Sequence, residues 1–331
     1  LAGIFFVASQ QAAGAAWSVA FRRVPEAMAG SLPYGAAVLA AVFLLGSSVY
    51  AWRHEAEHLT GFKGAWLDLP FFLARAALYL VLWFLFTRAI LGSSRQYDHS
   101  RDPGEARRGV RLSVVFLVVF AVTFWLASFD WVMSLEPHWY STIFGIYNFA
   151  GMFSAGIAAM ILLVLWLRRG PLVDFVTPEH LHDLGKYLFA FCTFWMYIWF
   201  SQYMLIWYAN IPEETVYFVH RQSGLWMPIF LLNVFLNWVV PFVVLLPKWT
   251  KRDPAILGKV AVVVLAGRLV DLYLMIYPPI SGAAPALGLW EIGPAAAAGS
   301  LFVLVFARSF RTRLPVPLAD SRLTESLHYH N

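Results

Sequence analysis

Nine long apolar stretches, separated by short polar connections, constrain the fold of this chain more than any other feature of its sequence. They cover residues 1–21, 32–51, 69–91, 109–133, 139–167, 184–209, 223–246, 256–277 and 287–307. A bilayer core about 30 Å thick needs roughly 20 apolar residues in a helix. Backbone groups in lipid must be paired within the segment, and these runs lack the alternation of barrel strands. The sequence therefore predicts an all-α integral membrane protein with nine transmembrane helices.

The composition agrees with this class. Charged residues make up only 13% of the chain, against about 25% in a soluble domain. This excludes a disordered tail, a nucleic-acid binder and a disulfide scaffold. The single cysteine, Cys192, has no partner for an internal disulfide, and the sequence contains no CxxCH haem-attachment motif. All nine histidines lie at span ends or in connections, so we expect no membrane haem on this chain.

The placement of basic residues predicts the orientation in the membrane. Of the 24 lysines and arginines, nineteen lie in the odd-numbered connections or in the C-terminal tail, and three lie in the even-numbered connections. Cytoplasmic connections are enriched in lysine and arginine, so we expect the odd connections and the tail in the cytoplasm. The chain begins with Leu1 inside an apolar run, which we interpret as a chain without its natural N-terminus.

The densest polar and aromatic segment, residues 128–142, joins the fourth and fifth spans. Asp130, Glu136, His138 and Tyr140 together predict a proton path, because histidine titrates near neutrality and desolvation raises carboxylate pKa values. The alternative is a tight hairpin, in which the carboxylates neutralise helix ends and the tryptophans anchor the interface. Asp130 also lies at a depth similar to that of Arg75 on the third span, which predicts an ion pair across the hairpin.

Polar residues also occur inside the spans. Arg268 and Asp271 share one face of the eighth span, where charges are costly and by default mark a functional site. The alternative is a self-neutralising pair that joins two helices. Asn148 and Gln202 would either hydrogen-bond between helices or line a chain of waters. Lys186 would mark either a proton entrance on the cytoplasmic side or a solvated helix start.

Five runs of this sequence carry a resemblance to a known family. They are AGAAWSVAFRR (13–23), FDWVMSLEPHWYSTIFGIY (129–147), LGKYLFAF (184–191), FSQYMLIWYANIPEE (200–214) and RLVDLYLMIYPP (268–279). They resemble the ActF subunit of bacterial alternative complex III, and the resemblance covers nearly the whole chain. It implies an NrfD-like fold, of the polysulfide-reductase type, with ten helices, of which this chain would lack the first. It also implies two four-helix bundles, at 1–133 and 134–277. The apolar runs and the basic residues add a final membrane helix at 278–307 and a cytoplasmic tail at 308–331.

The resemblance implies a subunit of a quinol-oxidising complex in the bacterial inner membrane, with no redox centre of its own. Haem and iron–sulfur clusters would belong to cytochrome c subunits and an iron–sulfur subunit. A larger NrfD-like paralogue, small membrane subunits and lipid would complete the surroundings. Within that complex the chain would provide a scaffold and a proton path, with these candidate residues: Asp130, Glu136, His138, Tyr140, Asn148, Lys186, Gln202, Arg268 and Asp271.

Two other functions stay open. Related subunits often carry a histidine in the first visible helix, where this chain has Gln10 and Gln11. Glutamine hydrogen-bonds a quinone carbonyl but cannot take its proton, so binding of menaquinone or another quinone at these residues is the alternative. A stand-alone secondary transporter is less favoured, because no pair of Gly- or Pro-interrupted spans marks inverted repeats.

Overall fold

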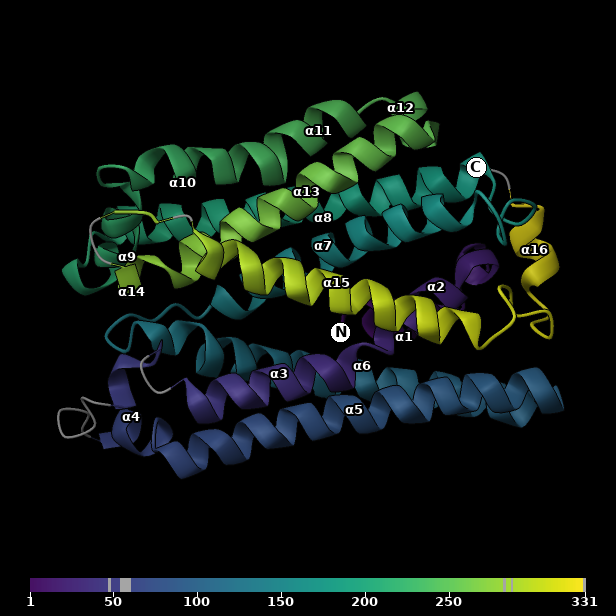
Figure 1. Ribbon diagram of the computed structural model, residues 1–331, viewed down its shortest axis with the longest axis horizontal. Helices are drawn as coiled ribbons and strands as arrows, with labels where there is room; N and C mark the ends of the chain where they lie inside the picture. The colour runs from purple at the N-terminus through teal and green to yellow at the C-terminus, as the bar shows by residue number, and fades with distance from the viewer. Residues whose placement is uncertain (47–48, 54–60, 282–283, 287, 330–331) are drawn as a thin grey trace.

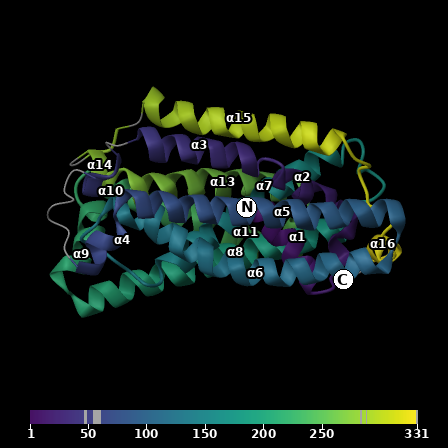
Figure 2. The same ribbon diagram turned by 90° about the horizontal axis from the view of Figure 1, so that it is seen from below.

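The computed structural model describes residues 1–46, 49–53, 61–281, 284–286 and 288–329, and every regular element in these ranges is helical. Eight helical segments among the described residues are long and apolar enough to cross a membrane. They run side by side along the long axis of the molecule (Figures 1 and 2). The prediction of an all-α integral membrane protein is confirmed.

The first part of the chain contains short helices followed by a long hairpin. In chain order the elements are α1 (Ala2–Ala12), η1 (Trp17–Phe21), α2 (Arg23–Ala29), α3 (Leu32–Leu45), η3 (Ala51–Arg53), α4 (Gly61–Trp66), α5 (Leu69–Ser100) and α6 (Pro103–Trp131). Asp68 and Asp102 cap the two long helices, because their carboxylates accept hydrogen bonds from backbone N–H groups of the first turn. Arg101 adopts a left-handed backbone with φ 54° and ends α5.

The second part begins after the turn η5 (Met133–Leu135). Its elements are α7 (Phe144–Leu167), α8 (Pro178–Ala209), α9 (Pro212–Gln222), α10 (Trp226–Val234), η6 (Phe235–Val239), α11 (Val240–Leu245), α12 (Lys248–Arg252), α13 (Pro254–Ile276), α14 (Pro278–Ser281), α15 (Leu289–Arg311) and α16 (Leu323–Leu327). Proline opens α8, α9, α13 and α14, where its missing N–H group costs nothing. The element η6 is a π-helical turn that joins α10 to α11 within one span.

The span at 139–167 is helical only from Phe144, where α7 begins, and three further predicted spans differ from the structure. The span at 1–21 is wrong as a single helix, because α1 ends at Ala12 and Gly14 turns the chain with φ +64°. The span at 32–51 is helical as α3 only to Leu45, and its residues 47–48 lie outside the described residues. The span at 287–307 begins as a helix at Leu289, and residue 287 is likewise outside the described ranges.

The helices pack around buried apolar cores and leave apolar side chains on the outside. α5 packs on α6, α1 lies against α2 and α6, and α7 contacts both α8 and α13. In Figure 1, α3, α5 and α6 lie on one side of the molecule, and α7, α8, α10, α11 and α13 on the other. Outward-facing residues such as Leu85, Val118 and Leu205 are more than half exposed. Such a surface is stable against lipid or other membrane chains rather than water.

The two ends of the molecule differ in which connections they carry. α12 and α16 lie at one end, and α4, α9 and α14 lie at the other (Figure 1). The connections rich in lysine and arginine therefore gather at the end marked by α12 and α16. Which membrane side this end faces stays a prediction, as does the division into two four-helix bundles.

Candidate functional site

The carboxylate of Asp271 lies at the centre of a buried polar cluster, in the last two turns of α13. The hydroxyl of Tyr147 and the amide of Asn233 donate to Oδ1, the amide at 3.1 Å. The indole of Trp195 donates to Oδ2 at 3.2 Å, and Arg268 forms an ion pair with the same oxygen. These donors come from α7, α10, α8 and α13 itself. The five residues are termed the Asp271 cluster below.

Glycines on two helices make room for this cluster. A Cβ on Gly151 of α7 would lie 2.6 Å from Cζ of Arg268, and a Cβ on Gly267 would lie 3.0 Å from the amide of Asn237. Asn237 lies in the π-helical turn η6 and donates to the side-chain oxygen of Asn233 at 2.7 Å. The turn therefore supports a residue of the cluster, and π-helical turns are frequent at functional sites.

Arg75 and Asp130 form a second buried ion pair, as predicted from the sequence. Nε and Nη2 of Arg75 each donate to one oxygen of Asp130 at 3.0 Å. The indole of Trp66 and the hydroxyl of Tyr79 also donate to this carboxylate, at 2.8 and 3.1 Å. The Arg75 guanidinium lies over the Trp66 ring, 4.0 Å from its centroid. The pair thus joins α4, α5 and α6.

The structure does not bring together the four residues of segment 128–142 that were predicted to pass protons. Asp130 faces α5, whereas Glu136 accepts a hydrogen bond from Nη2 of Arg221 on α9 at 2.6 Å. His138 and Tyr140 are exposed, and no hydrogen bond joins either of them to the two carboxylates among the described residues. The reason is local: α6 ends at Trp131 and the chain turns through η5, so the side chains diverge.

Three further candidates are not among the five residues of the Asp271 cluster. Asn148 donates to the carbonyl of Phe144 in its own helix at 3.1 Å. Lys186 pairs with Asp183 at 2.5 Å near the start of α8. Gln202 is buried about two turns beyond Trp195 on the same helix. Within the described part of the chain, none of the three candidates hydrogen-bonds the carboxylate of Asp271.

Gln10 and Gln11 point towards different helices. Gln10 donates to the hydroxyl of Tyr187 on α8 and accepts from the indole of Trp17, both at 3.0 Å. Gln11 accepts from the hydroxyl of Ser113 on α6 at 2.8 Å. Neighbouring residues of a helix are about 100° apart around its axis, so the two amides do not face one ligand.

A buried ion network around Glu26 was not singled out in the sequence. The Glu26 carboxylate is fully buried and accepts from Nη1 of Arg23 at 2.6 Å, from Ser94 at 2.7 Å and from Nη1 of Arg313 at 3.0 Å. It also lies 3.5 Å from Nε of Arg22. The sequence signal for this network was Glu26 close to Arg22 and Arg23 within an apolar region. A charge buried there needs an oppositely charged partner, so the three residues could have been predicted to pair.

No protein-family model and no curated protein matches this chain. Its buried polar groups and cavities therefore have to indicate the function.

Across the ranges that the structure describes, no group of three or more His, Cys, Asp or Glu side chains is arranged to hold a metal ion. His54, His58 and His330 lie outside those ranges.

An apolar cavity of about 550 Å³ lies beside α4, between it and the end of α6. Phe62, Trp66, Phe129 and Met133 are among the residues that form its walls, and Glu136 and Tyr140 supply polar groups. Small-molecule sites have volumes of about 300–1,000 Å³ and combine such apolar walls with a few polar groups. The cavity thus has the size and chemistry for an aromatic ligand.

Proposed function

We propose that this chain is a membrane subunit of a quinol-oxidising electron-transfer complex, alternative complex III, in which it acts as a scaffold and carries protons through the Asp271 cluster. The observation that carries the proton role is the position of Asp271, a fully buried carboxylate in an apolar helix with donors from four helices. An ionisable group inside a membrane span is costly and marks a functional site.

The chemistry of the cluster fits proton transfer. The Tyr147 hydroxyl donates to Asp271 and has lone pairs free to accept, so it can take up one proton while it passes another to the carboxylate. Arg268 holds a permanent positive charge beside the Asp271 carboxylate. Protonation of Asp271 then weakens its attraction to Arg268, which gives the cluster two electrostatic states.

The scaffold role is supported by the exposed apolar faces of the helices. The resemblance to ActF names their partners as a larger NrfD-like subunit, small membrane subunits, cytochrome c subunits and an iron–sulfur subunit. In this proposal those partners hold the haem and the iron–sulfur clusters, the complex lies in the bacterial inner membrane, and the C-terminus is cytoplasmic.

The proton role is tested in the whole complex reconstituted into vesicles that contain a pH-sensitive dye. Asp271→Asn is expected to lower the number of protons moved per electron while quinol oxidation continues. Asp130→Asn is the matched control, because it neutralises an equally buried paired carboxylate in another part of the chain. An unchanged ratio in Asp271→Asn, or an equal fall in both variants, contradicts the proposal.

Complex membership is tested separately. A tagged copy of this chain, extracted from its native membrane in a mild detergent, is expected to purify with haem-bearing and iron–sulfur subunits. Absorption spectra and iron analysis of the purified material identify these partners. Purification of the chain alone, without either cofactor, contradicts the assignment to such a complex.

A second candidate function, quinone binding, is favoured by the cavity beside α4. Glu136 lines the cavity and is held by Arg221, so a carboxylate is available to accept a quinol proton next to aromatic walls. A soluble quinone analogue is expected to quench tryptophan fluorescence of the purified chain and to bind more weakly to Glu136→Gln. The double variant Gln10→Leu/Gln11→Leu is the control for the site expected from the sequence. If quinone binding is lost in Gln10→Leu/Gln11→Leu and is unchanged in Glu136→Gln, the quinone site is not the cavity beside α4.

A further inference from the structure

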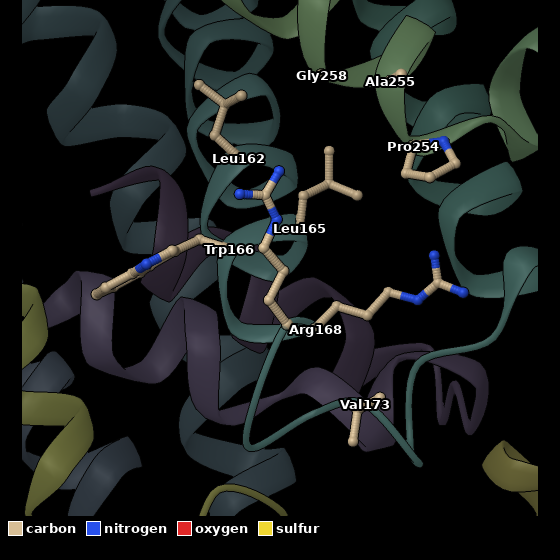
Figure 3. A pocket seen from close by; sticks show the side chains of 9 residues that line it. Leu162, Leu165, Trp166, Arg168, Val173, Pro254, Ala255 and Gly258 are labelled. Atoms are coloured by element: carbon tan, nitrogen blue, oxygen red, sulfur yellow. The ribbon is translucent and has the colours of Figure 1, made fainter.

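A cavity of about 630 Å³ lies between the C-terminal end of α7 and the N-terminal end of α13 (Figure 3). Its apolar side is formed by Leu162 and Leu165 of α7 and by Gly258 of α13. Arg168 and Arg169, which directly follow α7, supply two positive charges. One cavity therefore combines an apolar wall with two guanidinium groups.

Among the described residues, the two positive charges of this cavity have no acidic partner. Nε of Arg168 donates to the backbone carbonyl of Val176 at 3.1 Å, which holds the side chain near the connection after α7. Neither arginine forms an ion pair with an Asp or Glu side chain in the part of the chain that the structure describes. An anion bound in the cavity would give these two positive charges an opposite charge.

The cavity lies at the level where the membrane span ends. α7 is apolar up to Leu167, and the arginines follow at once. Trp166 lines the cavity and is 52% exposed, as expected for a tryptophan at the membrane interface. The arginines therefore lie at headgroup depth, and Leu162, one turn or more further inside, lies at the depth of the acyl chains.

Gly258 keeps the apolar side of the cavity open. A Cβ at this position would meet Cδ1 of Leu165 at 3.2 Å, so a larger side chain would fill the space between α7 and α13. The helical backbone itself does not require glycine here, since no left-handed φ is found at Gly258. The absence of a side chain thus preserves a groove that leads from the arginines towards the membrane interior.

We infer that this cavity binds an anionic phospholipid, with its phosphate held by the arginines that line the cavity and one acyl chain along the groove beside Gly258. Guanidinium groups bind phosphate oxygens through paired, charge-assisted hydrogen bonds. Basic pockets between membrane helices are a known type of site for anionic headgroups. A zwitterionic lipid would bring an ammonium group close to the arginines, and free phosphate would leave the apolar wall uncovered.

The test measures lipid binding to the purified chain by native mass spectrometry. Phosphatidylglycerol is expected to bind more tightly than phosphatidylcholine of the same acyl chains. Arg168→Gln/Arg169→Gln is expected to weaken phosphatidylglycerol binding about 30-fold, because each basic residue near the membrane surface contributes about 1 kcal/mol to the binding of an anionic lipid. The matched control is Arg308→Gln/Arg311→Gln, which removes two exposed charges from the last turn of α15 and is expected to change binding little.

Two further arms distinguish a bound lipid from a bound inorganic anion. Gly258→Leu leaves every charge in place and is expected to weaken lipid binding by filling the groove. Inorganic phosphate at millimolar concentration is expected not to displace the lipid. Equal binding of the two lipids, equal losses in the two arginine double variants, or displacement by phosphate overturns the inference. If Arg168→Gln/Arg169→Gln does not purify as a single species, Gly258→Leu alone tests the inference. Unchanged lipid binding in Gly258→Leu then overturns the inference.

Discussion

Gly151 on α7 lies directly against the guanidinium of Arg268 on α13. A Cβ at Gly151 would lie 2.6 Å from Cζ of Arg268, closer than two such atoms can approach. The glycine therefore allows Arg268 to reach Asp271 along the face that the two helices share. The ion pair between Arg268 and Asp271 therefore depends on the close packing of α7 on α13 at Gly151.

Gly151→Ala is expected to lower the free energy of unfolding by about 1–3 kcal/mol, because the added methyl group overpacks the interface and displaces Arg268. Unfolding by denaturant in detergent solution measures the change. Gly92→Ala on α5 is the control, since nothing lies within 4 Å of a Cβ built there. It is expected to be neutral or stabilising by up to about 1 kcal/mol, and equal behaviour of the two variants contradicts the prediction.

Removal of the Asp130 carboxylate is expected to be strongly destabilising. Asp130→Ala leaves the Arg75 guanidinium buried without its partner, which costs about 3–5 kcal/mol. The double variant Arg75→Ala/Asp130→Ala is expected to lose less than the sum of the two single changes, because neither charge then remains alone. Unfolding free energies of the four proteins measure this coupling, and strictly additive losses rule it out.

Docking of the C-terminal segment is expected to depend on pH through Asp320. Asp320 pairs with Arg22 and with Nε of Arg322, the latter at 3.3 Å. Burial alone would raise the pKa of Asp320, but the two arginines lower it below its ordinary value of 3.8. A lowered folded-state pKa means that the stabilisation is complete above about pH 4 and is lost as the pH falls through the folded value.

The measurement is hydrogen exchange of residues 316–327 across this pH range. Exchange, corrected for its intrinsic pH dependence, is expected to accelerate below about pH 4 in the native chain and to be fast at pH 7 in Asp320→Asn. Asp174→Asn, a change at an exposed residue in another connection, serves as the control. Slow exchange of Asp320→Asn at pH 7 would show that the ion pairs do not hold the segment.

Lys251 is expected to stabilise the end of α11. Its ammonium group donates to the backbone carbonyls of Leu245, Leu246 and Pro247 at 2.5, 3.2 and 3.0 Å. Lys251→Met leaves these carbonyls without that donor and is expected to cost about 1–3 kcal/mol in unfolding free energy. Lys259→Met on the exposed face of α13 is expected to cost less than about 0.5 kcal/mol, and a similar loss in both variants argues against the capping role.

The sequence predicted contacts where the partners are close along the chain or lie on helices joined by a single turn. Arg268 and Asp271 are three residues apart, so helical periodicity alone places them on one face. Arg75 and Asp130 lie on the two arms of one hairpin, and their matching depths were sufficient to pair them. The side chains of segment 128–142 that were predicted to act together have different partners, because the direction of each one depends on the turn after α6.

The apolar runs by themselves determined that this chain is a helical membrane protein, because a backbone in lipid has to pair its own N–H and C=O groups. Only the tertiary structure decided that Tyr147 meets Asp271 across 124 positions and that Glu26 meets Arg313 across 287. Such meetings depend on how each helix is rotated and packed against its neighbours, which hydrophobic periodicity leaves open when every face of a helix is apolar.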